Sequence, residues 1–147
     1  MSERPILVWD LPQRLFHWSL VALCALSWWS GEEGGVMLKY HLWSGYAVLT
    51  LVLFRIGWGF VGSRHARFGD FLRGPHAILH TLRALPGREA LPHAGHNPVG
   101  GLMVLALLLV LGVQTGTGLF ANDDIMNEGP LYALVSKSMS DRLTGWH

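Results

Sequence analysis

Three segments of the chain are long hydrophobic runs. They cover residues 12–29, 40–61 and 99–120, and the third contains the stretch LMVLALLLVLGV. About 20 apolar residues are enough for an α-helix to cross a bilayer. Inside lipid every backbone polar group must be bonded within the segment, so a helix is the only open-chain structure that can span it. The pattern therefore predicts an all-α transmembrane helical bundle with three spans.

The end of the chain has a different pattern. A polar segment follows the third run, and the chain then reaches LTGWH at residues 143–147. We interpret these residues as the start of a fourth helix, and we expect the sequence to be a fragment of a four-helix protein. A length of 147 residues suits one domain, so residues 1–147 are expected to form a single integral membrane domain.

The composition agrees with a membrane protein. Hydrophobic residues make up 50% of the chain, charged residues only 14%, and the mean hydropathy is +0.31. A soluble domain carries about 25% charged residues. The net charge of +1 gives no reason to expect a nucleic-acid partner, whereas membrane lipid is expected. The oligomeric state is left open.

The charges in the loops predict an orientation. The loop between the second and third runs has five arginines and two acidic residues, whereas the chain after the third run has four acidic and two basic residues. Basic loops stay on the cytoplasmic side. We therefore expect a multi-pass protein of the bacterial inner (plasma) membrane with a cytoplasmic N-terminus and periplasmic acidic loops. Within the basic loop, residues 67–85 mix arginines with leucines, which predicts a short interfacial helix.

Three of the eight histidines lie where a membrane helix is expected to begin or end. His17 is near the cytoplasmic end of the first helix, His41 near the outer end of the second, and His147 at the outer start of the fourth. A neutral imidazole can bind iron through one ring nitrogen while an acceptor holds the other N–H. Taken singly, each histidine could equally lie half-solvated at the interface. Their placement at opposite faces favours metal ligands. The other histidines are interpreted as loop or interfacial residues: His65, His76, His80, His93 and His96.

Small and basic residues near these histidines support a bound cofactor. Gly45 lies four residues after His41, on the same helix face, where it would let a flat macrocycle approach the backbone. Ordinary close helix packing is the alternative for this glycine. Arg55, inside the second run, could pair with the propionates of a haem or extend its charge to the headgroups, and the two readings are equally weighted. Arg14 lies one helical turn before His17.

The third run ends in polar residues. The sequence QTGTG at residues 114–118 interrupts the hydrophobic pattern near the expected outer face. Its amide and hydroxyls could bond to a haem, a quinone or a neighbouring helix. We favour bonding between helices, which is the usual role of such residues in membrane bundles.

Several stretches, in chain order, carry a resemblance to a known family. They are VWDLPQRLFHW at 8–18, HLWSGY at 41–46, RIGWGFVGSRHARF at 55–68, GHNPVGGLMVLALLL at 95–109, and TGLFANDD with GPL within 117–131. The chain resembles the bacterial cytochrome b561 family, which includes the membrane cytochrome b subunit of nickel–iron hydrogenases. The resemblance covers essentially the whole chain, and its specificity lies in the combination rather than in any one stretch.

The resemblance implies a four-helix membrane bundle with two b-type haems, one near each face and each with two histidine ligands. Carried over by position, His17 and His41 match the ligands of the first and second helices. His147 matches the outer of the two histidines that the fourth helix supplies. His41 and His147 would then share the outer haem. His17 would share the inner haem with a histidine that this sequence does not contain.

The resemblance also implies transmembrane electron transfer between the quinone pool and a periplasmic redox partner. That partner would be a c-type cytochrome, a hydrogenase or a similar oxidoreductase. The chain would then be an electron-carrier subunit rather than a stand-alone enzyme, with no catalytic residue. The alternative is a haem-free membrane anchor, or a small proton or metal transporter that uses buried histidines.

Overall fold

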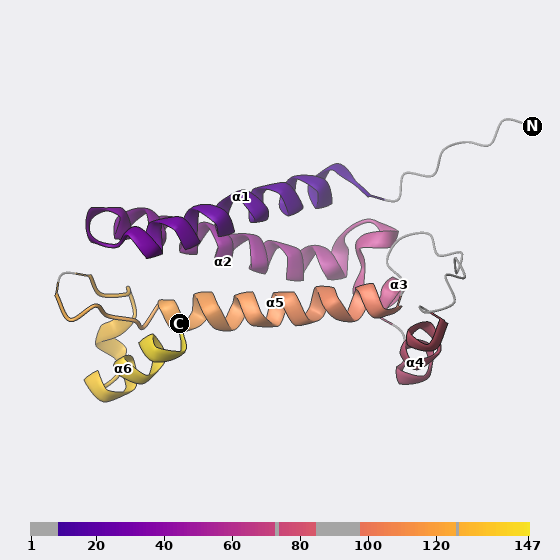
Figure 1. Ribbon diagram of the computed structural model, residues 1–147. Helices are drawn as coiled ribbons and strands as arrows, with labels where there is room; N and C mark the ends of the chain where they lie inside the picture. The colour runs from indigo at the N-terminus through magenta and orange to yellow at the C-terminus, as the bar shows by residue number, and fades with distance from the viewer. Residues whose placement is uncertain (1–8, 73, 85–97, 126) are drawn as a thin grey trace, which may run out of the picture. The chain divides into compact units, whose positions relative to one another are not determined.

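The computed structural model describes residues 9–72, 74–84, 98–125 and 127–147 (Figure 1). Every regular element in these ranges is a helix, and one isolated bridge joins Asn122 and Glu128. The helices are α1 (Leu11–Glu33), η1 (Gly35–Met37), α2 (Leu38–Val61), η2 (Arg64–Ala66), α3 (Phe68–Phe71), α4 (Pro75–Ala84), α5 (Pro98–Gly118), η4 (Tyr132–Leu134) and α6 (Lys137–Trp146). The predicted all-α class is therefore confirmed.

Two of the three predicted spans are long and apolar enough to cross a membrane. They are Gly35–Val61, which contains α2, and Pro98–Gly118, which is α5. Helix α1 has 23 residues but is less hydrophobic, because indole, hydroxyl and charged side chains interrupt its apolar run. The span expected at residues 12–29 is therefore a helix whose crossing of the membrane stays a prediction.

The chain divides into two compact units, which are described separately. Unit 1 contains Met1–Phe16 and Phe54–Leu107, and unit 2 contains His17–Leu53 and Leu108–His147. Each long helix contributes one part to each unit. The single domain expected over residues 1–147 stays a prediction.

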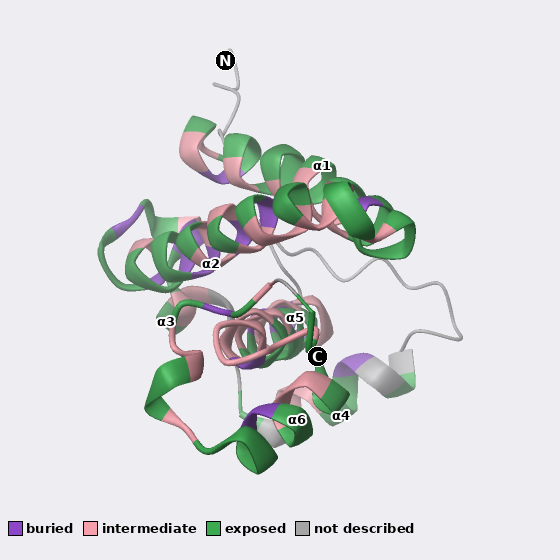
Figure 2. Ribbon diagram, turned by 90° about the vertical axis from the view of Figure 1, so that its left-hand side faces the viewer, coloured by how far each residue is buried: buried purple, intermediate pink, exposed green. Residues whose placement is uncertain are grey.

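Unit 2 is built on an antiparallel pair of helices. The C-terminal part of α1 leads through the short η1 turn into the N-terminal part of α2 (Figure 1). Gly34 and Gly35 make this turn with φ angles of 61° and 51°, a left-handed conformation that glycine adopts without strain. Buried positions recur every four residues along α2, at Ser44, Val48 and Val52, and appear as purple bands in Figure 2. That spacing is the inward face of an α-helix.

Unit 1 is held by contacts around the C-terminal end of α2. The ring of Phe68 in α3 lies against the backbone of Gly59, where an added Cβ would overlap the ring. Phe60 meets Phe68 edge-on with ring centroids 5.4 Å apart. The Nε of Arg67 donates to the carbonyl of Gly62 at 2.8 Å and so fixes the chain reversal after α2. Gly59 thus permits the close helix approach.

Helix α4 falls within the segment expected to form an interfacial helix. The exposed residues His76, Leu79, His80 and Arg83 share one face, and Thr81 on the opposite face is buried. The helix itself is confirmed, and its position at a membrane surface stays a prediction. The Arg88 and Glu89 part of the basic loop lies outside the described residues.

The helix containing residues 143–146 begins earlier than the sequence pattern suggests. Helix α6 starts at Lys137, where Ser136 accepts a hydrogen bond from the backbone N–H of Met139 at 3.4 Å. A serine in this position satisfies one of the unpaired N–H groups of a first turn. His147 is the residue directly after α6, and a fourth membrane helix beginning in this region stays a prediction.

Candidate functional site

His41 and His147, separated by 106 positions in the sequence, meet in unit 2. Their Nε2 atoms lie 3.2 Å apart, and their ring centroids are separated by 5.5 Å with the planes at 84°. His41 is one turn into α2, and His147 caps the end of α6. The structure thus brings together the two histidines that the family resemblance assigns to one site.

Hydrogen bonds fix the tautomer of both rings. The Nδ1 of His41 lies 2.8 Å from the backbone carbonyl of Ser27, and the Nδ1 of His147 lies 2.8 Å from the carbonyl of Gln114. A carbonyl oxygen only accepts, so each Nδ1 must carry the proton and each neutral ring keeps a lone pair on Nε2. Two lone pairs 3.2 Å apart repel each other. A cation between the two Nε2 atoms would relieve this repulsion, which agrees with the ligand role expected for the pair.

Two glycines allow the rings to lie close to the helices. A Cβ on Gly31 of α1 would lie 3.0 Å from the Nδ1 of His41. A Cβ on Gly118, at the end of α5, would lie 2.7 Å from the Cε1 of His147. Real Cβ atoms essentially never approach closer than 3.0 Å. Any larger residue at position 118 would therefore displace the His147 ring.

A cavity of about 510 Å³ adjoins the histidine pair within unit 2. This volume lies in the range of small-molecule and cofactor pockets. Its lining combines apolar, small and polar residues from α1, α2, α5 and the chain after α5, including Cys24, Trp28, Gly31, Leu42, Gly45, Val48, Leu111, Gly118 and Asn127. An added Cβ on Gly45 would meet no atom within 4 Å, so this glycine leaves part of the cavity open.

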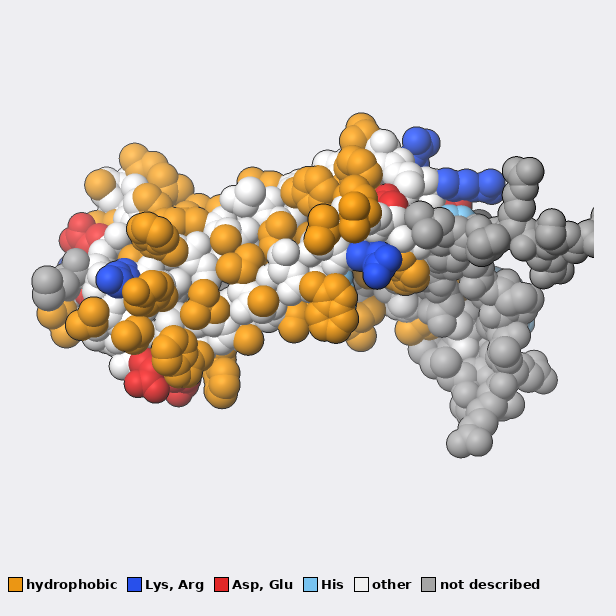
Figure 3. Space-filling view, turned by 90° about the horizontal axis from the view of Figure 1, so that it is seen from above, with side chains coloured by type: hydrophobic (Ala, Val, Ile, Leu, Met, Phe, Trp, Pro, Cys, Tyr) orange, Lys and Arg blue, Asp and Glu red, His pale blue; other side chains and the backbone are white. Residues whose placement is uncertain are grey.

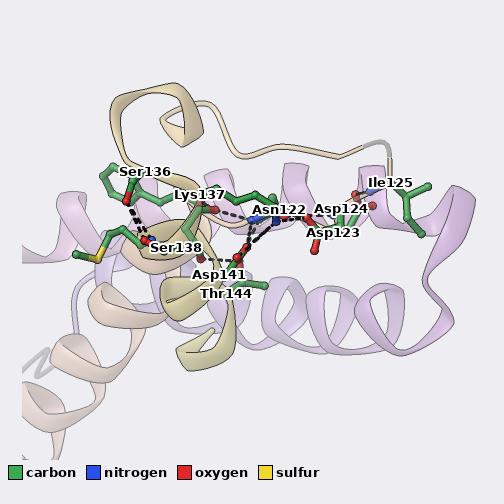
Figure 4. Close-up of polar contacts among 12 residues, drawn as sticks. Asn122, Asp123, Asp124, Ile125, Ser136, Lys137, Ser138, Asp141 and Thr144 are labelled. Carbon is green, nitrogen blue, oxygen red and sulfur yellow. Dashed lines mark hydrogen bonds and ion pairs between the residues drawn. The ribbon is translucent and has the colours of Figure 1, made fainter.

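Buried polar contacts anchor α6, and with it His147, to the loop after α5 (Figure 4). The hydroxyl of Ser140 is fully buried, donates to the Phe120 carbonyl at 2.6 Å and accepts from the amide of Asn122 at 2.6 Å. The backbone N–H of Asn122 donates to the Thr144 hydroxyl at 3.1 Å. These bonds set the position of the last turn of α6.

The exposed side of this loop carries an ion-pair network, also drawn in Figure 4. The Nζ of Lys137 donates to the carboxylates of Asp124 and Asp141. Those two hydrogen bonds raise the pKa of Lys137 above its usual range. Hydrogen bonds from Asn122 and Lys137 lower the pKa of Asp141. The carboxylate of Asp123 instead accepts from backbone N–H groups of its own loop, so its role is to shape the loop.

The structure does not pair His17 with a second histidine among the described residues. His17 is exposed on α1, and its ring contact is with Trp18 at a centroid distance of 5.5 Å. Arg14 is exposed one turn earlier on the same helix. His93 and His96 lie outside the described residues. The ligand role of His17 therefore stays a prediction.

Arg55 belongs to unit 1 and is 2% exposed. Its guanidinium carbon lies 5.3 Å from the centre of the Phe68 ring, a distance typical of a cation–π contact. Asp10, also in unit 1, interacts with this positive charge. Arg55 does not line the cavity of unit 2. The propionate role that the sequence left open for this arginine stays a prediction.

Part of this site had no distinct signal in the sequence. The acceptors for the two Nδ1 atoms are main-chain carbonyls of Ser27 and Gln114, and a carbonyl is present at every position. Gln114 does show the bonding between helices favoured for QTGTG, because its side-chain amide donates to the His147 carbonyl. Thr115 and Thr117 bond instead to carbonyls of their own helix. For Gly31, its place one turn before the α1–α2 reversal was the only signal.

Comparison with known proteins gives the family. The model of the family described as prokaryotic cytochrome b561 matches residues 8–147. The chain belongs to this family. Two relatives, from Azotobacter chroococcum mcd 1 and Azotobacter vinelandii, each carry the name "Probable Ni/Fe-hydrogenase B-type cytochrome subunit". Each is 31% identical over 173 aligned positions, which cover 99% of this chain and 68% of the relative. No solved structure matches the chain at a significant level.

Membership of the cytochrome b561 family makes the chain a membrane-integral b-type cytochrome that transfers electrons, with haem b as its cofactor. The chain's own residues fit that cofactor. A porphyrin supplies four of six iron ligands, so a protein needs to add only two. Two metal–nitrogen bonds of roughly 2 Å each need a separation of about 4 Å, less than 1 Å more than the His41–His147 pair now has. The carbonyls of Ser27 and Gln114, which accept the two Nδ1 protons, are already in place.

Proposed function

We propose that this cytochrome carries electrons across the bacterial inner membrane, between the quinone pool and a periplasmic redox partner. His41 and His147 are proposed as the axial ligands of an outer haem. The observation that carries this proposal is the pair of opposed Nε2 atoms, whose Nδ1 protons are both donated to backbone carbonyls. When bound, haem b supplies a one-electron Fe(III)/Fe(II) couple.

The residues of unit 2 would support electron transfer by keeping the two histidine rings in fixed positions. His41 and His147 are fixed by acceptors on two further helices, so the ligand geometry changes little between the charge states. Because both rings stay bound, no proton has to move at either Nε2. The cavity is lined by residues of four helices and of the loop after α5, which hold its walls in place around the histidine pair. These features keep the reorganisation on electron transfer small.

An inner haem is proposed at His17, whose partner would be a histidine that this sequence does not contain. Arg14 and Arg55 are kept as proposed partners of haem propionates, since arginine pairs with carboxylate through two parallel hydrogen bonds. Gly45, by contrast, faces the cavity of unit 2 and is proposed to admit the outer macrocycle. The complete protein would then hold two haems.

A hydrogenase is the favoured periplasmic partner. Both relatives are named as hydrogenase cytochrome subunits, which supports this class of partner over others. The exposed acidic side chains of unit 2 include Glu32, Glu33, Asp124 and Glu128. Charge of one sign on a docking surface accelerates association with a surface of opposite sign. A basic partner surface is therefore expected.

Replacing one proposed ligand tests the outer haem. We expect His41→Ala to retain less haem in unit 2, because the iron would keep only one of its two proposed protein ligands. The measurement is a pyridine haemochrome assay, with haem counted per chain. His80→Ala, an exposed histidine on α4 in unit 1, is the control and should leave the count unchanged. Equal haem content in wild type and His41→Ala would refute the assignment.

Neutralising two exposed acidic residues tests the partner surface. Glu33→Gln combined with Glu128→Gln should slow electron transfer with a basic c-type cytochrome several-fold at low salt and flatten its salt dependence. Asp123 is left intact because its carboxylate shapes the loop. Lys39→Gln, which removes an exposed positive charge from the same unit, should act in the opposite direction. Stopped-flow rates over a range of ionic strength give the answer, and unchanged rates in both variants would exclude electrostatic docking here.

A further inference from the structure

The rings of the histidine pair are held nearly at a right angle. Their planes meet at 84°. The acceptor for the His41 Nδ1 is the Ser27 carbonyl of α1, whereas the acceptor for the His147 Nδ1 is the Gln114 carbonyl of α5. An N–H···O bond weakens steeply when it bends, so each acceptor restrains the rotation of its ring. The two restraints come from different helices, and neither depends on the other.

The two glycines beside the rings reinforce these restraints. Gly31 leaves just enough room for the His41 ring, and Gly118 leaves just enough for the His147 ring. With no Cβ at either position, an edge of each ring can approach the helix that supplies its acceptor. A side chain at either position would push against the ring whose Nδ1 that helix holds.

We propose that Gly31, Gly118 and the carbonyls of Ser27 and Gln114 are positioning groups that hold the two haem-ligand planes near perpendicular and thereby raise the midpoint potential of the outer haem. This inference rests on the proposed ligation by His41 and His147. It adds to that ligation a geometry, the groups that impose it, and its electronic effect.

The electronic argument concerns two d orbitals of the iron. Each imidazole raises the energy of the orbital that overlaps with its π system. Parallel rings raise the same orbital, whereas perpendicular rings raise one each and leave the two nearly equal in energy. A large splitting favours the ferric state, because its half-filled orbital is the raised one. Perpendicular rings lack that stabilisation, and so the ferrous state is favoured and the potential is higher.

Electron paramagnetic resonance of the oxidised protein tests the geometry. The outer haem is identified as the low-spin signal that disappears in His41→Ala. We expect that signal to be highly anisotropic, with one resolved low-field feature. A rhombic signal with three resolved features would overturn the perpendicular geometry and leave the ligation intact. If His41→Ala removes no low-spin signal, the proposed ligation itself fails.

Alanine at the glycines tests the positioning groups. Gly118→Ala should rotate the His147 ring, move the signal towards the rhombic form and lower the midpoint potential. Gly31→Ala should act in the same direction but more weakly, because its Cβ contact is longer. Gly116→Ala on the same helix is the matched control, since its Cβ would meet no atom within 4 Å.

The haem content, the resonance signal and the midpoint potential of the glycine variants together decide the proposal. Retained haem with an unchanged signal and potential in Gly118→Ala would overturn the proposal. Should Gly118→Ala fail to retain haem, the milder Gly31→Ala decides by the same two readouts. A shift in Gly116→Ala as large as in Gly118→Ala would also count against it, because the effect would then not depend on ring contact.

Discussion

The carboxylate of Asp10 bonds to residues of both α1 and α2 within unit 1. It accepts from the backbone N–H of Gln13 at 2.9 Å and from the indole of Trp58 at 3.1 Å, and so joins the start of α1 to α2. Burial alone would raise the pKa of Asp10. Hydrogen bonds from Ser63, Gln13 and Trp58, together with the charge of Arg55, outweigh that effect and hold the pKa below its usual value.

The lowered pKa gives a pH dependence of known sign. Since the folded state favours the charged carboxylate, the contribution of Asp10 to stability is present above the ordinary carboxyl pKa of about 3.9 and is lost as the pH falls through the lower folded value. Asp10→Ala should reduce the free energy of unfolding by about 1 to 2 kcal/mol at neutral pH, the usual effect of losing an N-cap. Thermal unfolding in detergent between pH 7 and pH 3 provides the measurement.

Asp10→Asn is the matched control for charge, because asparagine also caps helices. It should keep more of the neutral-pH stability than Asp10→Ala and lose the acid-dependent part. Identical acid sensitivity in wild type and Asp10→Asn would show that the charge of Asp10 contributes nothing.

At the scale of elements, α6 is the helix whose docking completes the histidine pair. It is short and polar, and an isolated helix of 10 residues is marginal in water. Its stability therefore depends on Ser140, Thr144 and the ion pairs of Lys137 with the loop after α5. Because His147 directly follows α6, its position depends on these contacts.

Ser140→Ala tests this dependence. The change leaves the Phe120 carbonyl and one Asn122 N–H without their Ser140 bonds, at a cost of about 1 to 3 kcal/mol for buried groups. We expect a lower thermal midpoint, followed at the haem absorbance, and faster loss of haem. Ser138→Ala, an exposed serine on the same helix, should leave both unchanged. Equal midpoints in the two variants would show that the buried serine does not anchor α6.

Hydropathy predicted the long helices closely and α6 hardly at all. The runs at 40–61 and 99–120 became α2 (Leu38–Val61) and α5 (Pro98–Gly118), because in lipid an apolar run of that length must be helical. Helix α6 has no apolar run, and its only local signal is the capping serine Ser136. The pairing of His41 with His147 came from family resemblance, since no local pattern relates positions 106 residues apart.

For the whole molecule, the kind of side chain that is exposed indicates whether water or lipid surrounds it. Hydrophobic side chains cover much of the visible face in Figure 3. On α5 the exposed residues include Leu102, Met103, Leu107, Leu109, Val110 and Val113. A contiguous apolar surface of this kind is rare on soluble monomers. Lipid tails rather than water are therefore its natural surroundings.

A charge placed on this surface should interfere with insertion. Leu109 is 69% exposed and lies near the centre of α5, so Leu109→Lys should cost roughly 3 to 4 kcal/mol in a membrane-insertion assay. Met139→Lys, on the polar α6, is the control and should insert normally. Equal insertion of both variants would mean that α5 is not exposed to lipid.

The distance between His41 and His147 along the sequence also determines the order in which the two histidines are synthesised. Ribosomes add about 5 to 20 residues per second, so His147 emerges roughly 5 to 20 s after His41. During that interval α2 has been synthesised, but the His147 ring that would face His41 has not. A cofactor delivered early would be held by one side only and released again. For the proposed outer haem, loading should therefore follow the docking of α6 rather than guide it.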